Sequence, residues 1–102
     1  MYSLEIHKKA RETLDFLKNK DLKELKNIIA VLDEIVKKWF NISNLKNIWD
    51  WISRKRIWRY RMLMTLDRKE KNKIHIWIID LEKDTKKDYK KWKLYIMKYE
   101  FI

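Results

Sequence analysis

The chain has 102 residues, a formal net charge of +11, and no cysteine, glycine or proline. A chain of this length builds one hydrophobic core, and the absence of cysteine excludes disulfides and thiolate metal sites. Apolar residues make up 46% and aromatic residues 14% of the sequence, which is the composition of a folded protein and not of a disordered one. We therefore expect a single domain over residues 1–102 whose partner is anionic, most simply a nucleic acid.

The sequence predicts no membrane partner. Its longest unbroken apolar run, Ile28–Leu32, is far shorter than a membrane span. The first residues lack the apolar core of a signal peptide, so we expect a cytoplasmic protein.

The first part of the chain changes from a strand pattern to a helix pattern at Lys8. Apolar and polar residues alternate over residues 2–7, which predicts a short strand. From Lys8 a helical spacing predicts a helix that ends near Lys20 and buries Ala10, Leu14 and Leu17. Asp21 is the expected N-cap of a second helix, with Glu24 completing a capping box. The apolar face predicted for this second helix consists of Leu22, Leu25, Ile29, Leu32, Val36, Trp39 and Phe40.

The middle of the chain predicts a β-hairpin that carries most of the charge. After an irregular segment over residues 41–47, Ile48–Ser53 is predicted to be a strand and Arg54–Arg56 a basic turn. Arg59–Leu66 alternates as a strand, and residues 67–73 form a charged tip. Ile74–Ile79 is apolar on both sides of the pleat, which predicts an interior strand. Residues 54–73 hold nine Lys or Arg against two acidic residues, so +7 of the net charge lies there.

The pattern after Asp80 fits two structures. Asp84 or Thr85 caps a helix with Tyr89, Trp92 and Ile96 on one face, or residues 94–102 extend as a strand or arm. The predicted order is β-α-α-β-β-β with a short C-terminal helix or arm. This order predicts an α+β fold in which the N-terminal helical hairpin lies on one face of a small antiparallel sheet.

Three segments in this order of elements resemble the RelE/ParE toxin superfamily of type II toxin–antitoxin pairs. They are Tyr60–Leu63 (YRML), Ile74–Ile79 (IHIWII) and Lys86–Tyr89 (KKDY). The resemblance covers nearly the whole chain and depends on order, spacing and length together. RelE-like toxins cleave mRNA in the ribosomal A site without a metal, whereas ParE-like toxins inhibit DNA gyrase.

The resemblance to the RelE branch implies a metal-free, ribosome-dependent mRNA endonuclease without a cofactor, and a cognate acidic antitoxin that binds it in a hetero-oligomer. It places Arg61 at the phosphate and Tyr89 as the base, with Lys83 near the position of a family arginine. The two strand lysines of the family have no clear counterpart here. The residues expected to bind RNA are Arg54, Lys55, Arg56, Arg59, Lys86 and Lys87. A gyrase inhibitor and a basic nucleic-acid-binding relative without catalysis remain alternatives.

The residues themselves leave further alternatives open. Arg59 and Arg61 are expected on one strand face, where they line a groove or form a solvated surface paired with acidic side chains. Tyr89 acts in catalysis or packs in the core. His75 lies in an apolar strand and is expected to be a packing residue, and His7 has no partner at ligand spacing, so we expect no metal site. Trp49, Trp51 and Trp58 are flanked by basic residues and are candidates for base stacking.

Overall fold

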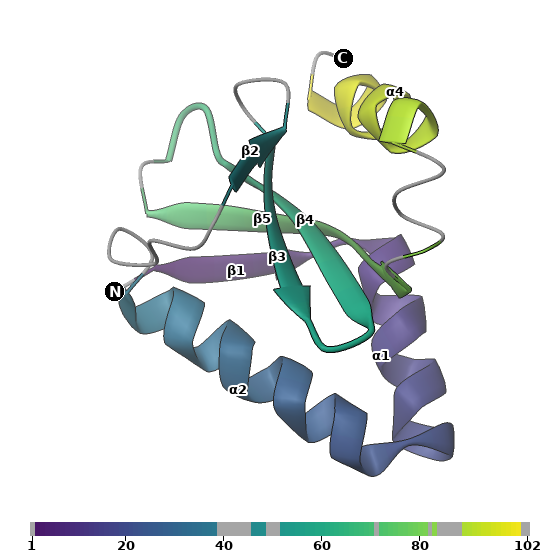
Figure 1. Cartoon of the computed structure of the whole chain (residues 1–102). Helices are drawn as coiled ribbons and strands as arrows, with labels where there is room; N and C mark the ends of the chain where they lie inside the picture. Colours follow the sequence, from purple (N-terminus) through teal and green to yellow (C-terminus); the bar gives the residue numbers. More distant parts are fainter. Residues whose placement is uncertain are drawn as a thin grey trace.

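The structure is a computed structural model that describes residues 2–38, 46–48, 52–70, 72–81, 83 and 89–100. In Figure 1 the helices α1 and α2 lie on one side of a five-stranded sheet and the helix α4 lies on the other. The elements in chain order are β1 (Ser3–Ile6), α1 (Lys8–Lys20), α2 (Leu22–Lys38), β2 (Lys46–Ile48), β3 (Ile52–Ile57), β4 (Tyr60–Leu66), β5 (Lys73–Leu81) and α4 (Tyr89–Glu100). The predicted α+β fold with an N-terminal helical hairpin on one face is confirmed.

The sheet has the strand order β1-β5-β4-β3-β2. Strands β2 to β5 pair antiparallel, as predicted, and β1 runs parallel to β5. Because β5 is hydrogen-bonded on both sides, the predicted interior position of Ile74–Ile79 is confirmed. The parallel pairing of β1 was not predicted, because alternation of apolar and polar residues looks the same in parallel and antiparallel pairs.

The basic segment Arg54–Arg56 is a strand and not the turn that the sequence predicts. The segment lies inside β3, which pairs with β2 through Ile48 and Ile52 and with β4 along its length. Buried isoleucines at both ends, Ile52 and Ile57, anchor this strand in the two apolar clusters of the fold. The other residues of the predicted Ile48–Ser53 strand, 49–51, lie outside the described part of the chain.

The turn into β4 consists of Trp58 and Arg59, because Ile57 pairs directly with Tyr60. Trp58 has a φ of 56°, in the left-handed region that glycine occupies most easily. The chain contains no glycine, so a tryptophan with 67% of its surface exposed takes this conformation. A left-handed backbone costs a residue with a side chain roughly 1–2 kcal/mol.

The helical hairpin and its N-cap form as predicted, but the full capping box and the predicted apolar face of α2 do not. The carboxylate of Asp21 accepts a hydrogen bond from the Glu24 N–H at 3.1 Å, which confirms the N-cap. The reciprocal half of the capping box is not formed, since Asp21 N–H donates to Leu17 O. In α2 the predicted apolar face is partly wrong: Leu22 is 58% and Ile29 is 51% exposed, and the buried apolar residues are Ile28, Leu32 and Ile35. The predicted Trp39 and Phe40 lie outside the described residues.

Two apolar clusters hold the layers together. The larger one joins α1 and α2 to the sheet through residues such as Leu17, Ile28 and Met62. The smaller one joins α4 to the opposite face and contains Ile52, Leu63, Trp77, Ile78, Trp92 and Ile96. Of the two structures predicted after Asp80, the structure has the helix and not the strand or arm. No helix in the described ranges is both long and apolar enough to cross a bilayer.

A β-bulge sets which β5 side chains face α4. Leu63 pairs with Ile78 but the next residue, Met64, pairs with Ile76, so Trp77 is the extra residue of the bulge on β5. Trp77 and Ile78 therefore both belong to the α4 cluster, although they are adjacent in sequence. We call this side of the sheet the α4 face.

Candidate functional site

Three arginines lie on the α4 face at one end of β3 and β4. Arg56 pairs directly opposite Arg61, and Arg54 pairs opposite Leu63, which belongs to the α4 cluster. Directly opposite residues in an antiparallel pair point to the same face, so Arg54, Arg56 and Arg61 share that face. We call these three residues the arginine face. Like charges in directly opposite positions destabilise a sheet unless an anion lies nearby.

Arg61 is the most buried member of the arginine face, with 7% of its surface exposed. Its directly opposite residue on β5 is Asp80. A buried guanidinium requires an acidic group close to it, and the register supplies one. Arg56 is exposed, and its Nε–H donates to Trp58 O at 3.2 Å, which holds the side chain over the turn.

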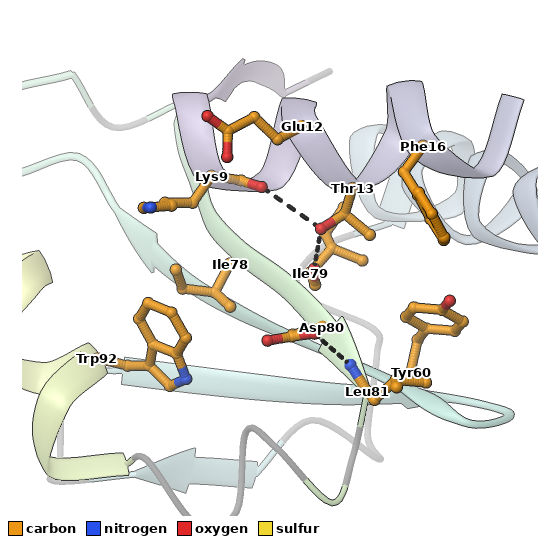
Figure 2. A pocket seen from close by; sticks show the side chains of 10 residues that line it. All are labelled: Lys9, Glu12, Thr13, Phe16, Tyr60, Ile78, Ile79, Asp80, Leu81 and Trp92. Carbon is orange, nitrogen blue, oxygen red and sulfur yellow. Dashed lines mark hydrogen bonds between the residues drawn. The ribbon is translucent and has the colours of Figure 1, made fainter. Parts of the chain in front are cut away.

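A cavity of about 360 Å³ opens beside Asp80 at the end of β5. Figure 2 shows α1 side chains (Lys9, Glu12, Thr13 and Phe16) along one wall, with Tyr60, Asp80 and Trp92 across from them. It forms where β1 has already ended, since β1 covers only Lys73–Ile76 of β5. The hydroxyl of Thr13 donates to Ile79 O at 2.6 Å and so satisfies one carbonyl of this uncovered strand edge. Burial raises the pKa of the Tyr60 hydroxyl, which favours its neutral form there.

The other predicted site residues do not gather at the arginine face. Lys55 pairs opposite Met62 and points to the face of the sheet that packs against α1 and α2. Arg59 lies in the turn and not in β4, and its Nη2 is 3.7 Å from an Asp21 carboxylate oxygen, so it does not share a strand face with Arg61 as predicted. Lys83 is exposed beyond the end of β5.

Tyr89, Lys86 and Lys87 complete the predicted set. Tyr89 is the first residue of α4, the helix that covers the α4 face, and its side chain lies outside the described part of the structure. Lys86 and Lys87 lie outside the described residues altogether.

A second polar group, which the sequence did not reveal, lies at the other end of the α4 face. The Nε2 of His7 is 2.9 Å from Nδ1 of His75, and the same His75 atom is 2.9 Å from a Glu5 carboxylate oxygen. On its far side the Nε2–H of His75 donates to Asp67 Oδ1 at 2.7 Å. We call Glu5, His7, Asp67 and His75 the histidine cluster.

The parallel pairing of β1 with β5 creates the histidine cluster. It places Glu5 directly beside His75, and the His7 N–H donates to Ile76 O, so the first turn of α1 starts at the same level. The premise that His7 has no partner is therefore wrong, because the partner is 68 residues away in the sequence. The expectation that His75 is a packing residue accounts for its burial but not for its carboxylate contacts.

The electrostatics of the cluster follow from its contacts. Burial is the largest cause that lowers the pKa of His7, which favours the neutral ring. Hydrogen bonds from the Glu70 N–H, from His75 and from the Lys69 N–H lower the pKa of Asp67, so this group stays a carboxylate. His7 also stacks on Trp77 with ring centres 3.7 Å apart, which fixes the plane of its ring.

The α4 face thus carries two polar groups, a cationic one on β3 and β4 and a histidine–carboxylate one on β1 and β5. The cationic group suits phosphate binding, since guanidinium groups match phosphate oxygens in shape and charge. No protein-family model, curated protein or solved structure matches the chain.

Proposed function

We propose that this protein is the toxin of a type II toxin–antitoxin pair that cleaves mRNA on the ribosome, in the cytoplasm, with the RelE-like chemistry that the sequence resembles. The observation that carries the proposal is the cross-strand pair Arg56–Arg61, with Arg54 beside it on the same face. Guanidinium groups match phosphate oxygens in shape and charge, so three of them on one face suit an RNA backbone as ligand.

Metal-free cleavage of RNA uses the 2′-hydroxyl as the nucleophile. A base must take its proton, cations must hold the charge that develops on the phosphate, and an acid must protonate the leaving 5′-oxygen. Arg61 has the planar guanidinium that bonds two phosphate oxygens at once, and its burial limits its motion. Tyr89 is the base that the resemblance implies, at the start of the helix covering this face.

The burial of Arg61 limits how a substrate phosphate reaches it. Because only 7% of Arg61 is exposed, a substrate phosphate reaches it only if the neighbouring groups move or if the phosphate enters along Arg56. Arg54 and Arg56 then act as the outer contacts that bring the RNA backbone in. The expected antitoxin is an acidic segment that covers the same arginines and neutralises them.

A ParE-like inhibitor of DNA gyrase is the second candidate. Strand β3 carries three basic residues, Arg54, Lys55 and Arg56, and a basic strand suits the binding of an acidic protein surface as well as RNA binding. This candidate needs no catalytic Tyr89 and predicts no message cleavage.

The experiment that separates the candidates adds purified protein to a bacterial translation extract and maps the ends of the message, beside a gyrase supercoiling assay. Arg61→Lys keeps the charge but removes the two-oxygen contact, and we expect it to slow cleavage by roughly 10² or more. Tyr89→Phe should also slow cleavage. Lys55→Gln is the matched control, because it removes a charge from β3 on the opposite face.

Equal cleavage by Arg61→Lys, Tyr89→Phe and the wild type would overturn the site assignment. Blocked supercoiling with messages intact would favour the gyrase inhibitor. Unfolding transitions of each variant establish that any loss of cleavage does not come from loss of the fold.

A further inference from the structure

The histidine cluster lies outside the arginine face, and the proposed cleavage does not use it. Three of its donor atoms converge on one point: Glu5 Oε2, His7 Nε2 and His75 Nδ1 lie within 4.8 Å of one another. They come from β1, the start of α1 and β5, so the fold brings together three separate parts of the chain. A fourth residue, Asp67, holds the ring of His75 from behind.

We propose that Glu5, His7 and His75 bind one divalent zinc-class metal ion, with an open fourth position. In tetrahedral zinc sites the bonds to histidine nitrogen and carboxylate oxygen are about 2.0–2.2 Å, so neighbouring donors are about 3.3 Å apart. The three separations here are 2.9 Å between the histidine nitrogens, 2.9 Å from Glu5 to His75 and 3.7 Å from Glu5 to His7. These values lie on both sides of the tetrahedral distance, so small side-chain movements suffice.

The hydrogen-bond chemistry also calls for a cation at this point. A carboxylate only accepts hydrogen bonds, and His75 has one on each ring nitrogen, Asp67 at 2.7 Å and Glu5 at 2.9 Å. With Nε2–H given to Asp67, the Nδ1 lone pair faces Glu5 Oε2 and His7 Nε2. The contacts among Glu5, His7 and His75 are all attractive only when a second proton or a metal ion lies between these groups.

Asp67 is the second hydrogen-bond partner that metal-bound histidines usually have. A carboxylate that accepts the second N–H of a ligating histidine fixes its tautomer and orientation. Asp67 is itself fixed by the Lys69 and Glu70 N–H groups, at 2.9 and 2.7 Å. His75 is 8% exposed and the ring of His7 is stacked on Trp77, so both imidazoles are held before a metal arrives.

The open coordination position faces a cavity of about 310 Å³ that is also lined by Arg68 and Lys69. These cations favour a water molecule or a small anion as the fourth ligand. Nearby cations oppose the metal, and one of them competes for a ligand: Lys73 Nζ lies 3.5 Å from the Glu5 oxygen that would ligate it. Lys73 is partly exposed, and its long side chain reaches solvent when it turns away from Glu5.

The test uses the untagged full chain, stripped with a chelator and titrated with Zn²⁺ by calorimetry, and with Co²⁺ by visible absorption as a report of tetrahedral geometry. We expect one ion per chain. Glu5→Gln and His7→Gln should each weaken binding at least tenfold, and Asp67→Asn, which touches no metal, by about 10–100-fold. Lys73→Gln should strengthen binding, because it removes the competing charge.

Glu34→Gln is the control, since Glu34 is an exposed carboxylate on α2, which packs on the face of the sheet opposite the histidine cluster. Unfolding transitions without metal show whether each variant is folded, and Lys73→Gln gives a result that does not depend on a damaged ligand. The proposal is overturned by an absence of saturable binding up to about 1 mM metal. It is also overturned if Glu5→Gln and His7→Gln bind as tightly as Glu34→Gln. Failure here leaves the proposed RNA cleavage unaffected, because the two sites share no residue.

Discussion

Replacing Arg56 by glutamine tests whether the arginine face is kept for ligand binding and not for stability. Arg56 and Arg61 are directly opposite each other in the β3–β4 ladder. Cross-strand pairs of this kind change stability by about 0.2–1 kcal/mol, and like charges act unfavourably. The hydrogen bond from Arg56 Nε to Trp58 O is solvent-exposed, so its loss offsets only part of the gain.

We therefore expect Arg56→Gln to raise the free energy of unfolding by up to about 1 kcal/mol, which is a rise in Tm of up to roughly 4–8 °C for a domain of this size. The gain should shrink in about 1 M salt, where the Debye length is about 3 Å and the wild-type repulsion is already screened. Lys55→Gln is the control on the same strand, since Lys55 lies opposite Met62 on the face that packs against α1 and α2.

The same substitution should weaken RNA binding. Loss of one phosphate contact to single-stranded RNA lowers the slope of log K against log salt by about 0.7. The assays are thermal unfolding and fluorescence anisotropy with a short single-stranded RNA, both over a range of salt. A variant that is less stable than the wild type and binds RNA equally well would refute the reasoning, because Arg56 would then be a structural residue.

Three further predictions concern single elements of the fold. Ile28→Ala should destabilise the protein by about 2–5 kcal/mol, whereas Ile29→Ala next to it should stay within about 0.5 kcal/mol; equal losses in denaturant unfolding would mean that the assigned face of α2 is wrong. Trp58→Gly should stabilise the turn by about 1 kcal/mol, since glycine adopts the left-handed backbone at less cost, while removing any stacking of RNA bases on this exposed ring; a lower Tm would contradict the strain. Asp67 has a lowered pKa in the fold, so the stability it supplies is present above the ordinary aspartate pKa of about 4 and is lost as the pH falls below it. Asp67→Asn should therefore flatten the fall in the denaturation midpoint between about pH 5 and pH 2, and a profile as steep as that of the wild type would show that other carboxyl groups cause the fall.

The sequence predicts well those elements whose hydrophobic pattern fits only one arrangement. Ile74–Ile79 is apolar on both sides of the pleat, and only an interior strand buries both. The α1 spacing of Ala10, Leu14 and Leu17 likewise matches the side that packs on the sheet. In α2, isoleucines at 28 and 29 belong to two overlapping apolar stripes, and packing against the sheet decides which one is buried.

The site is harder to predict, because it depends on pairings between distant segments. Alternation within β3 gives the faces of Arg54 and Arg56 only once the segment is known to be a strand, and a run of three basic residues suggests a turn. The histidine cluster depends on the parallel pairing of β1 with β5, which no local pattern encodes. His7 and His75 are separated in the sequence by the helical hairpin and the strands β2, β3 and β4, and nothing in the sequence shows that their rings meet.

The most direct test of the proposed cleavage is the chemistry of the message ends produced in a translation extract. Attack by the 2′-hydroxyl leaves a 2′,3′-cyclic phosphate or 3′-phosphate on the upstream fragment and a 5′-hydroxyl on the downstream fragment. We predict these ends with the wild-type protein and with Lys55→Gln, and their loss with Arg61→Lys. Fragments that end in a 3′-hydroxyl and a 5′-phosphate, or messages that stay intact while the protein is folded, would contradict the proposed function.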